Sequence, residues 1–322
     1  MLHLVNLSNY SSDLELINHS ATCLRLFLEQ HRLDGVEMMF CGPWDGRIHR
    51  REWVRGVHLK FWPYWLDFWR GDFPALIQHF GNEEMIIKSY GGLRREDWLQ
   101  VYRENIRQAK ATGAEYLVFH VSHARIPEMF SGSFGVSDRE VVEAAAEVVN
   151  RLADEIPDDM MLLFENLWWP GLTLQESELV AWLLEHVTPA QVGLMLDTGH
   201  LMNTNTELKS EEEGVDYIIQ TVEQLGSYKR YIKGIHLHCS LSGQYSKESR
   251  QKANRAKRDY SMKEVMDHVL RLDEHRPFSS AAVRRIIDCV RPDYVVHEFM
   301  QLSLQDWMDK VTTQQLALGV RR

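Results

Sequence analysis

The amino-acid sequence predicts a closed barrel of eight parallel strands with surrounding helices, a (β/α)8 or TIM barrel. Short runs of β-branched and apolar residues alternate with longer segments of helical period along the whole chain, which is the pattern of repeated βα units. The chain contains eight such runs, the number that a closed barrel of this kind needs. No Pro-, Gly- or Ser-rich linker divides the 322 residues, so we expect a single domain over residues 1–322.

Each expected strand is a short apolar run that ends in polar residues or turn signals. In chain order these strands cover residues 2–7, 35–40, 57–61, 116–121, 161–165, 192–197, 232–238 and 294–298. The segments between them repeat apolar residues at helical spacing and therefore predict helices. The expected helices cover residues 14–30, 96–111, 138–156, 174–186, 215–225, 280–289 and 304–316.

Two of these helices carry start signals. Ser137 with Glu140 fits a capping box before the helix at 138–156. Thr173 with Glu176 has a similar pattern before Leu174, so we expect the next helix to begin there. The connection after the third strand is unusually long, and we assign no elements to it.

Long loops follow the third and seventh strands, and on this fold both lie at the catalytic end of the barrel. Residues 61–69, FWPYWLDFW, are too aromatic for a solvated loop, so we expect a packed satellite cluster or the interface of a homo-oligomer, with a pocket wall as the alternative. The loop at 240–276 is expected to present a solvated basic helical face, with an anion-gripping flap as the alternative. Its basic residues are Lys247, Arg250, Lys252, Arg255, Lys257, Arg258 and Lys263.

The composition excludes several classes of protein. Thirty-six basic and 46 acidic side chains give a net charge of −10, which argues against broad binding to phosphate backbones and makes nucleic acid an unfavoured partner. The four cysteines form no CxxC pair, and the chain lacks a signal-like start and any apolar run of about 20 residues, so we expect a cytoplasmic protein without membrane contact. Neither a GxGxxG nor a GxSxG motif is present.

Ionisable residues cluster where four consecutive expected strands end, although an apolar barrel has no structural need for them there. Singly, each can be a helix cap or an ordinary hydrogen-bonded histidine. Together, several carboxylates in one cleft repel one another unless a cation or shared protons neutralise them. A mixed set of carboxylates and imidazoles suits a divalent metal such as Mn²⁺, Co²⁺, Mg²⁺ or Zn²⁺. The residues are Glu165, Asp197, His200, His236, His238 and Glu298.

In their order along the chain, these motifs resemble the metal-site strands of the xylose isomerase-like TIM barrels. That superfamily joins sugar isomerases and epimerases, inosose dehydratases, hydroxypyruvate isomerase and the endonuclease IV repair enzymes. The resemblance covers nearly the whole chain and implies that one divalent metal is bound by Glu165, Asp197, His236 and Glu298. The motifs that carry it are Phe164-Glu165-Asn166, Leu196-Asp197-Thr198-Gly199-His200, Gly234-Ile235-His236-Leu237-His238 and His297-Glu298-Phe299.

The resemblance also bears on three neighbouring residues. It implies that His200 touches the substrate in an epimerase or holds another metal in a nuclease-like member. His238 points to the same strand face as His236, so either histidine can be the metal ligand. Cys239 stands where many members carry an aspartate, which leaves the outer support of His236 unassigned.

Further residues fit a larger site. His58 lies in the third expected strand and His120 ends the fourth, so both are candidates for additional metal or substrate contacts. Asp273-Glu274-His275 resembles the Asp-x-His element that some superfamily members use to hold additional metals. The competing interpretation is a plain charged loop after the seventh strand.

The resemblance implies a metal-dependent sugar isomerase or epimerase of carbohydrate metabolism that acts on a small polyhydroxy substrate. A metal-stabilised enediolate then forms by proton transfer, with Glu165 and Glu298 as base and acid and His200 at the substrate. The first alternative is a multi-metal phosphodiesterase similar to endonuclease IV. The second is a non-catalytic barrel that keeps a metal for stability or ligand sensing.

Overall fold

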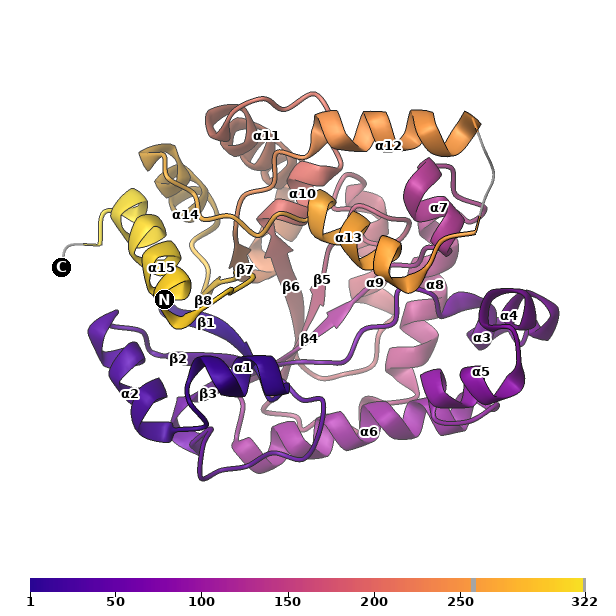
Figure 1. Cartoon of the computed structure of the whole chain (residues 1–322), viewed down its shortest axis with the longest axis horizontal. Coiled ribbons are helices and arrows are strands. Elements are labelled where there is room, and N and C mark those ends of the chain that lie inside the picture. Colours follow the sequence, from indigo (N-terminus) through magenta and orange to yellow (C-terminus); the bar gives the residue numbers. More distant parts are fainter. Residues whose placement is uncertain (256–258, 321–322) are drawn as a thin grey trace.

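The computed structural model describes residues 1–255 and 259–320, and it contains the predicted closed barrel. Eight strands pair in sequence order, every neighbouring pair is parallel, and β8 closes the ring against β1. Figure 1 shows the strands gathered at the centre with helices around them. The (β/α)8 fold class is therefore confirmed.

All eight strands occur at the predicted places in the chain. They are β1 (Leu2–Ser8), β2 (Gly35–Met39), β3 (Val54–His58), β4 (Tyr116–His120), β5 (Met161–Glu165), β6 (Val192–Asp197), β7 (Ile232–Leu237) and β8 (Tyr294–His297). The exception is β3. It covers Val54–His58, so it begins and ends three residues earlier than the strand predicted at 57–61. Its true end places His58 at the mouth of the barrel.

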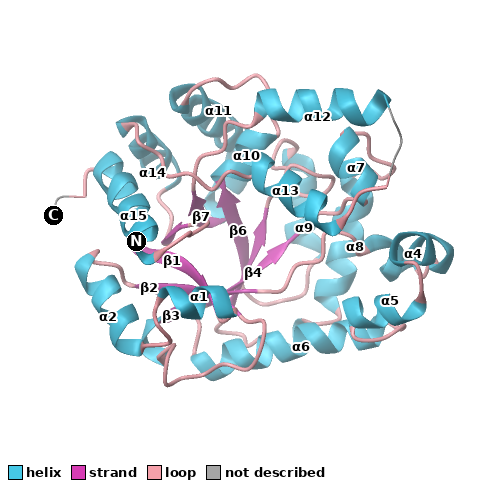
Figure 2. Ribbon diagram, viewed as in Figure 1, coloured by secondary structure: helices cyan, strands magenta, loops and turns pink. Residues whose placement is uncertain are grey.

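Helices cover the outside of the barrel, with short 3-10 turns between some of them (Figure 2). The α-helices are α1 (Ser11–Leu16), α2 (Ala21–Gln30), α3 (Leu66–Arg70), α4 (Phe73–Phe80), α5 (Glu83–Tyr90), α6 (Arg95–Thr112), α7 (Ile126–Ser131), α8 (Asp138–Asn150), α9 (Ser177–His186), α10 (Thr198–Asn203), α11 (Glu211–Gln224), α12 (Gly243–Arg255), α13 (Met262–Leu272), α14 (Arg284–Val290) and α15 (Leu304–Leu318). The 3-10 turns are η1 (Arg51–Trp53), η2 (Ala153–Glu155), η3 (Gly226–Tyr231) and η4 (Ala281–Val283).

The two predicted helix starts have different outcomes. Ser137 caps α8 as expected, because its hydroxyl accepts from Glu140 N at 3.3 Å and the Glu140 carboxylate accepts from Ser137 N at 2.9 Å. The prediction at Thr173 is wrong. Leu174 adopts a left-handed φ of 63°, which a helix does not tolerate, and α9 begins only at Ser177.

The predicted helix at 14–30 is divided into α1 and α2. Asn18 and His19 both adopt a left-handed φ of 50°, which breaks the helical hydrogen-bond ladder between the two pieces. Ser20 then caps α2, since its hydroxyl accepts from Cys23 N at 3.4 Å. The apolar periodicity continues across this break, and for that reason the sequence pattern alone predicts one helix.

The interior of the barrel is apolar at its amino-terminal end. Side chains alternate between the inside and the outside of each strand, so positions two apart share a face. Gly56 makes room for the Tyr116 ring, because a Cβ at Gly56 would lie 2.1 Å from the ring carbon Cζ. This inner cluster is formed by Leu4, Tyr116, Val118, Leu163, Met195 and Val296.

The aromatic segment at 61–69 packs inside the protein as expected, but its buried apolar residues belong to the main hydrophobic core rather than to a separate satellite cluster. Trp65 stacks on Trp98 of α6 with ring centroids 5.7 Å apart, and the Phe68 ring stacks on Tyr90 of α5 at 4.0 Å. The connection after β3 therefore contributes α3 to α6, four helices that cover this segment. Phe61 differs from the rest, because its ring lies 4.3 Å from His120 at the barrel mouth.

The loop at 240–276 forms α12 and α13. Its basic residues on these helices are exposed, which supports a solvated face, and Lys247 pairs with Glu207 at 2.7 Å. Lys257 and Arg258 lie outside the described residues. Among the described residues, every helix falls short of the length and apolarity that a bilayer crossing requires.

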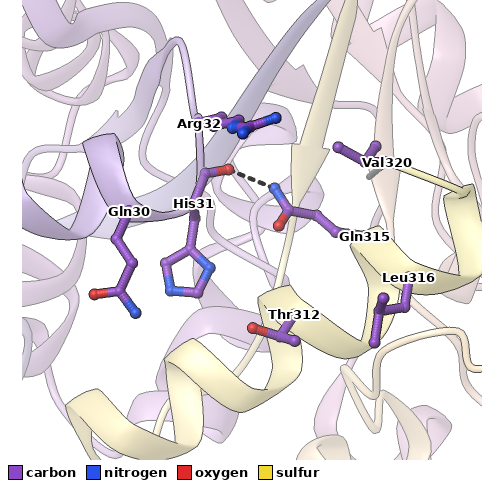
Figure 3. A pocket seen from close by; sticks show the side chains of 7 residues that line it. All are labelled: Gln30, His31, Arg32, Thr312, Gln315, Leu316 and Val320. Atoms are coloured by element: carbon purple, nitrogen blue, oxygen red, sulfur yellow. Dashed lines mark hydrogen bonds between the residues drawn. The ribbon is translucent and has the colours of Figure 1, made fainter. Parts of the chain in front are cut away.

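A cavity of about 240 Å³ lies between the end of α2 and α15 (Figure 3). Gln315 Nε2 donates to the His31 carbonyl across it at 2.6 Å. Residues 30–32 precede β2, so this cavity is at the amino-terminal end of the barrel. It is thus remote from the strand ends where the ionisable residues were predicted.

Candidate metal centre

Six consecutive strands place ionisable side chains at the carboxyl-terminal mouth of the barrel. Each is the last inward-facing residue of its strand or lies directly after it, one alternation above the apolar interior. They are His58 from β3, His120 from β4, Glu165 from β5, Asp197 from β6, His236 from β7 and Glu298 after β8. The side chains form overlapping groups whose ligand atoms lie within 4.8 Å of one another.

The first ligand group consists of His58, His120 and Glu165. Glu165 Oε2 lies 3.0 Å from His58 Nε2 and 2.7 Å from His120 Nε2, and the two Nε2 atoms are 3.1 Å apart. His58 Nδ1 donates to the Leu59 carbonyl at 2.9 Å, so the neutral ring presents a lone pair on Nε2. Ligands at about 2.1 Å from one metal are separated by about 3.0 to 3.4 Å, so the spacing fits a shared cation.

The second ligand group consists of Glu165, Asp197, His236 and Glu298. His236 Nδ1 lies 3.0 Å from Glu165 Oε1, 3.1 Å from Glu298 Oε2 and 3.8 Å from Asp197 Oδ2. Glu165 thus turns one oxygen toward each of the first two groups. Side chains at this depth are almost fully removed from solvent, and Glu298, with 15% of its side chain exposed, is the most accessible of the four.

Glu37 supports His236 from inside the barrel, and sequence reasoning did not identify this residue. Its Oε1 lies 2.9 Å from His236 Nε2, and its Oε2 accepts from the Tyr116 hydroxyl at 2.8 Å. A carboxylate on the far ring nitrogen fixes the tautomer in which Nδ1 faces the metal. Cys239 packs in the outer core instead, so the support that the sequence left unassigned comes from β2. The sequence signal that could have identified Glu37 is a single glutamate within an otherwise apolar strand.

Two further groups of possible ligands share His238: one with Asp197 and His200, and one with Asp273 and His275. We refer to His200, His238, Asp273 and His275 together as the third ligand group. His200 Nε2 lies 3.1 Å from Asp273 Oδ2, and His275 Nδ1 lies 3.3 Å from the same oxygen. His238 Nε2 lies 3.0 Å from Asp197 Oδ2, which connects this group to the second one. The Asp273–His275 segment is a loop after α13, and its Asp273 and His275 side chains lie beside His200 and His238. Its role in metal binding stays a prediction.

Local structure explains why these side chains converge. Asp197 caps α10, because its Oδ1 accepts from His200 N at 2.6 Å, and this turns the His200 ring back toward the mouth. Asn166 joins the ends of β5 and β6 by donating to Asp197 O at 3.0 Å and accepting from Asp197 N at 2.8 Å. His200 Nδ1 donates to Asn166 O at 2.9 Å, so the neutral ring presents its lone pair on Nε2 to Asp273.

The mutual influence of these groups shifts their pKa values. Burial raises the pKa of Glu165, but His120 and His236 outweigh it and hold that pKa well below its usual range. Burial lowers the pKa of His236, but Glu298, Glu37 and Glu165 outweigh it and raise that pKa well above its ordinary value. The pKa of His120 falls to about 3 because of burial, although Glu165 acts in the opposite direction.

The donor set fits divalent metals. Across residues 1–255 and 259–320, the ion pairs of the four carboxylates at the mouth run to histidines only, and neither Lys nor Arg neutralises them. Three buried atoms of side chains in the centre have no hydrogen-bond partner: His120 Nδ1, His238 Nδ1 and Glu298 Oε2, the last of which forms an ion pair with His236 Nδ1 at 3.1 Å. Buried carboxylates without compensation are strongly destabilising, so this arrangement favours either bound cations or protonated histidines beside the carboxylates.

Two aromatic rings border the ligand groups. Phe61 lies 4.3 Å from the His120 ring, and Trp168 lies 5.1 Å from the His200 ring. The rest of the 61–69 segment packs largely in the hydrophobic core, and Phe61 is its residue beside the ligand groups. Trp168 was not singled out from the sequence, because a tryptophan after a strand end is also typical of packing.

Every candidate residue named from the sequence lies in this centre. Glu165, Asp197, His236 and Glu298 come together as one group, and His58, His120, His200, His238, Asp273 and His275 surround them. Their roles as metal ligands or catalytic groups stay predictions. The sequence left open whether His236 or His238 is the metal ligand. In the structure both rings point into the centre, but they belong to different ligand groups.

Comparisons with known proteins agree with this fold. Residues 28–288 match the model of a protein family described as xylose isomerase-like TIM barrel. No curated protein matches the sequence. A D-tagatose 3-epimerase-like protein superposes with a TM-score of 0.54 at 15% identity, covering 99% of this chain and 98% of that one.

Two further solved structures, which are named as different enzymes, have the same fold. Endonuclease IV from Thermus thermophilus gives a TM-score of 0.53 at 14% identity, with 100% of both chains covered. An L-ribulose 3-epimerase gives 0.53 at 10% identity, covering 98% of this chain and 94% of that one. These identities establish the fold alone. The family match over most of the sequence shows that this chain belongs to the xylose isomerase-like TIM barrel family.

Proposed function

We propose that the protein is a multi-metal hydrolase that cleaves a phosphodiester in a small molecule. The observation that carries this proposal is that the three ligand groups are connected. Glu165 belongs to both the first and the second group, and Asp197 of the second group contacts His238 of the third. A one-metal isomerase needs the second group only. It gives no reason for a buried Asp273 or for paired His58 and His120.

The chain's own residues suit this chemistry. Bound divalent metals supply a nucleophile from water at neutral pH and compensate the charge of a phosphoryl group. Glu165 holds two groups at a fixed spacing, since each of its oxygens faces a different one. Glu298 and His275 are the most exposed of the carboxylates and third-group histidines, at 15% and 14% of their side chains, so they lie toward the entrance where a substrate arrives. Glu298, whose Oε2 lies 3.1 Å from His236 Nδ1, is the candidate general base at this entrance.

The substrate is expected to be small. No Lys or Arg within the described chain contacts the carboxylates of the centre, and the protein carries a net charge of −10, so a long polyanion finds little electrostatic attraction. Phe61 and Trp168 offer planar apolar walls beside the ligand groups. The four cysteines are free, which supports the proposal of a cytoplasmic site of action.

The test is hydrolysis of bis(4-nitrophenyl) phosphate by protein reconstituted with Zn²⁺, Mn²⁺ or Co²⁺. We expect turnover that a chelator abolishes and that falls at least about a hundredfold in both His58→Ala and Asp273→Asn, because each change removes a ligand from a different group. His186→Ala is the control, since His186 is exposed and its ring bonds the Trp182 carbonyl and stacks on the Trp182 ring, on a helix outside the ligand groups. Full turnover in either ligand variant contradicts the proposal.

A sugar isomerase or epimerase is the second candidate, and the second ligand group favours it. Glu165 and Glu298 approach the same His236 nitrogen at 3.0 and 3.1 Å, so one metal would leave a carboxylate on either side of a chelated hydroxy-carbonyl substrate for proton transfer. Ketose epimerisation that survives Asp273→Asn but not Glu298→Gln would establish this reaction. Metal that changes only the melting temperature, with no turnover of either substrate class, would establish a non-catalytic barrel.

A further inference from the structure

We infer that Glu274 is a positioning residue of the metal centre: its carboxylate joins the two ends of the loop at 240–276 and thereby holds Asp273 and His275 against the barrel. The inference rests on the proposed multi-metal centre, in which these two residues are candidate ligands. It goes beyond that proposal by giving the residue between them a role. The sequence Asp273-Glu274-His275 alone also permits another interpretation, in which Glu274 is an ordinary surface carboxylate paired with Arg276.

The Glu274 side chain makes contacts that differ from those of its two neighbours. Asp273 Oδ2 lies 3.1 Å from His200 Nε2, and the His275 ring stacks on the His238 ring with centroids 4.3 Å apart. Glu274 Oε2 instead accepts from Leu241 N at 2.7 Å, at the opposite end of the loop. Three successive residues thus divide their work, because two reach the centre and the middle one joins the chain ends.

Four further hydrogen bonds join the same two ends of the loop. Cys239 N donates to Arg276 O at 2.7 Å, and Arg276 N donates to Cys239 O at 3.2 Å. Glu274 N donates to Ser240 Oγ at 3.0 Å, and this buried hydroxyl donates to Asp273 Oδ1 at 3.4 Å. The clamp that these contacts form is called the loop stem and comprises residues 239–241 and 273–276.

The contact with Leu241 distinguishes Glu274 from a surface ion pair. Glu274 also pairs with Arg276 Nη2 at 2.9 Å, but 51% of the Arg276 side chain is exposed, and pairs of this kind contribute little to stability. Leu241 N is a backbone donor that needs an acceptor, and a carboxylate makes a strong charge-assisted bond to it. Loss of Glu274 therefore leaves a backbone group of the loop stem without this acceptor.

The barrel side of the centre is held independently of the loop stem. Thr198 Oγ1 accepts from His238 N at 3.0 Å and donates to His238 O at 2.6 Å, so α10 fastens the end of β7. Gly199 leaves the space that the His238 imidazole fills, because a Cβ there would lie 2.0 Å from His238 Cε1. A loosened stem is thus expected to displace Asp273 and His275 while His238 stays in place.

The backbone directly after Glu274 is strained. His275 adopts a left-handed φ of 46°, which is unfavourable for a residue with a Cβ and persists only where surrounding contacts hold it. Glu274 and the bridge between Cys239 and Arg276 supply such contacts on the two sides of His275. Removal of the Glu274 carboxylate should let this segment relax, so the effect is expected to reach both neighbouring side chains.

The first measurement is hydrogen–deuterium exchange of the metal-free, full-length protein, because it reports on the loop stem without metal or turnover. Glu274→Ala is expected to exchange the amides of residues 239–241 at least about tenfold faster than the wild type. Glu274→Gln should restore most of the protection, since its amide oxygen can still accept from Leu241 N. Glu248→Ala is the matched control, because Glu248 is an exposed glutamate of α12 that bonds Gln244. Unchanged exchange in Glu274→Ala would overturn the inference.

The second measurement is a Co²⁺ titration followed by elemental analysis and by the visible d–d absorption of Co²⁺. Glu274→Ala is expected to weaken by at least about tenfold the same Co²⁺ whose binding Asp273→Asn weakens, and to change its part of the spectrum, because outer contacts orient the ligands. The other bound Co²⁺ should be unaffected, and Glu274→Gln should again lie close to the wild type. Ser240→Ala removes another contact of the loop stem and should act in the same direction even if Glu274→Ala does not fold.

The two measurements separate this inference from the proposed function. Wild-type Co²⁺ affinity and spectrum in Glu274→Ala, with a Co²⁺ lost in Asp273→Asn, would overturn the positioning role and leave the proposed function intact. Unchanged Co²⁺ binding in Asp273→Asn would overturn the multi-metal centre and, with it, the role of Glu274 in that centre.

Discussion

The two ends of the barrel interior are built by the same strands and the same alternation, yet they do opposite things. Toward the amino-terminal end, Val118 and Leu163 are buried in an apolar cluster. One alternation further along the same strands, His120 and Glu165 belong to a candidate ion-binding group. The apolar end gains stability from burial. The polar end loses stability unless cations compensate its carboxylates, so we expect the two ends to respond differently to mutation, metal and pH.

The largest effect is expected for Glu165→Gln, because Glu165 serves both the first and the second ligand group. The amide keeps the shape of the side chain but removes the charge, so we expect lower metal content and a turnover reduced by at least about a thousandfold with the fold intact. Elemental analysis, circular dichroism and hydrolysis of bis(4-nitrophenyl) phosphate measure these three quantities. Unchanged metal content would refute the shared role of this carboxylate.

The comparison of the two ends is sharpened by combining Leu163→Ala with removal of metal. Leu163→Ala should lower the free energy of unfolding by about 2 to 5 kcal/mol, with and without metal, because it opens a cavity in the apolar end. A chelator should remove about 4 kcal/mol from the wild type for each bound metal whose free concentration was a thousandfold above its Kd. Denaturant titrations of wild type and Leu163→Ala, each with and without metal, test whether the two effects on the free energy of unfolding add. Strong non-additivity would show that the two ends are coupled.

Glu37→Gln tests the one contact that connects the two ends. Glu37 joins the Tyr116 hydroxyl to His236 Nε2, so its loss should weaken metal binding by about 10- to 100-fold while the barrel stays folded. Tyr116→Phe should have a smaller effect, since it removes only one hydrogen bond to Glu37. A competition titration with a chromophoric chelator measures both. If Glu37→Gln binds metal as tightly as the wild type, Glu37 does not support metal binding.

The smallest expected effect is the change in melting temperature with pH. Despite burial, neighbouring carboxylates raise the pKa of His236 and of His200 well above 6.5 in the metal-free protein. A raised pKa in the folded state contributes stability that is complete below about pH 6.5 and is lost as pH rises through the folded-state pKa. Metal competes with these protons, so the metal-loaded protein should show the opposite trend. Thermal scans with chelator and with Zn²⁺ from about pH 5.5 to 8.5 should diverge as the pH rises; parallel curves would contradict this.

The parts of the molecule that the sequence predicts correctly follow from local patterns. Strand alternation places Glu165 and His236 on inward positions, and the order of the strands brings them to one rim. The contact between Glu37 and His236 joins residues far apart in the chain, so its register cannot be derived from either strand alone. Asp273 and His275 reach the centre only because the Cys239–Arg276 bridge folds their segment back. These long-range contacts determine which residues join the site, and a local sequence pattern does not predict them.

Gly199 has a consequence for the evolution of this site. It adopts an ordinary helical conformation in α10, so its lack of a side chain serves the His238 imidazole rather than the backbone. Positions 199 and 238 are therefore expected to covary among related sequences, with a histidine at 238 accompanied by glycine at 199 and a smaller residue at 238 permitting a larger one. An alignment that shows this pairing would identify the members that share the contact between His238 and Asp197.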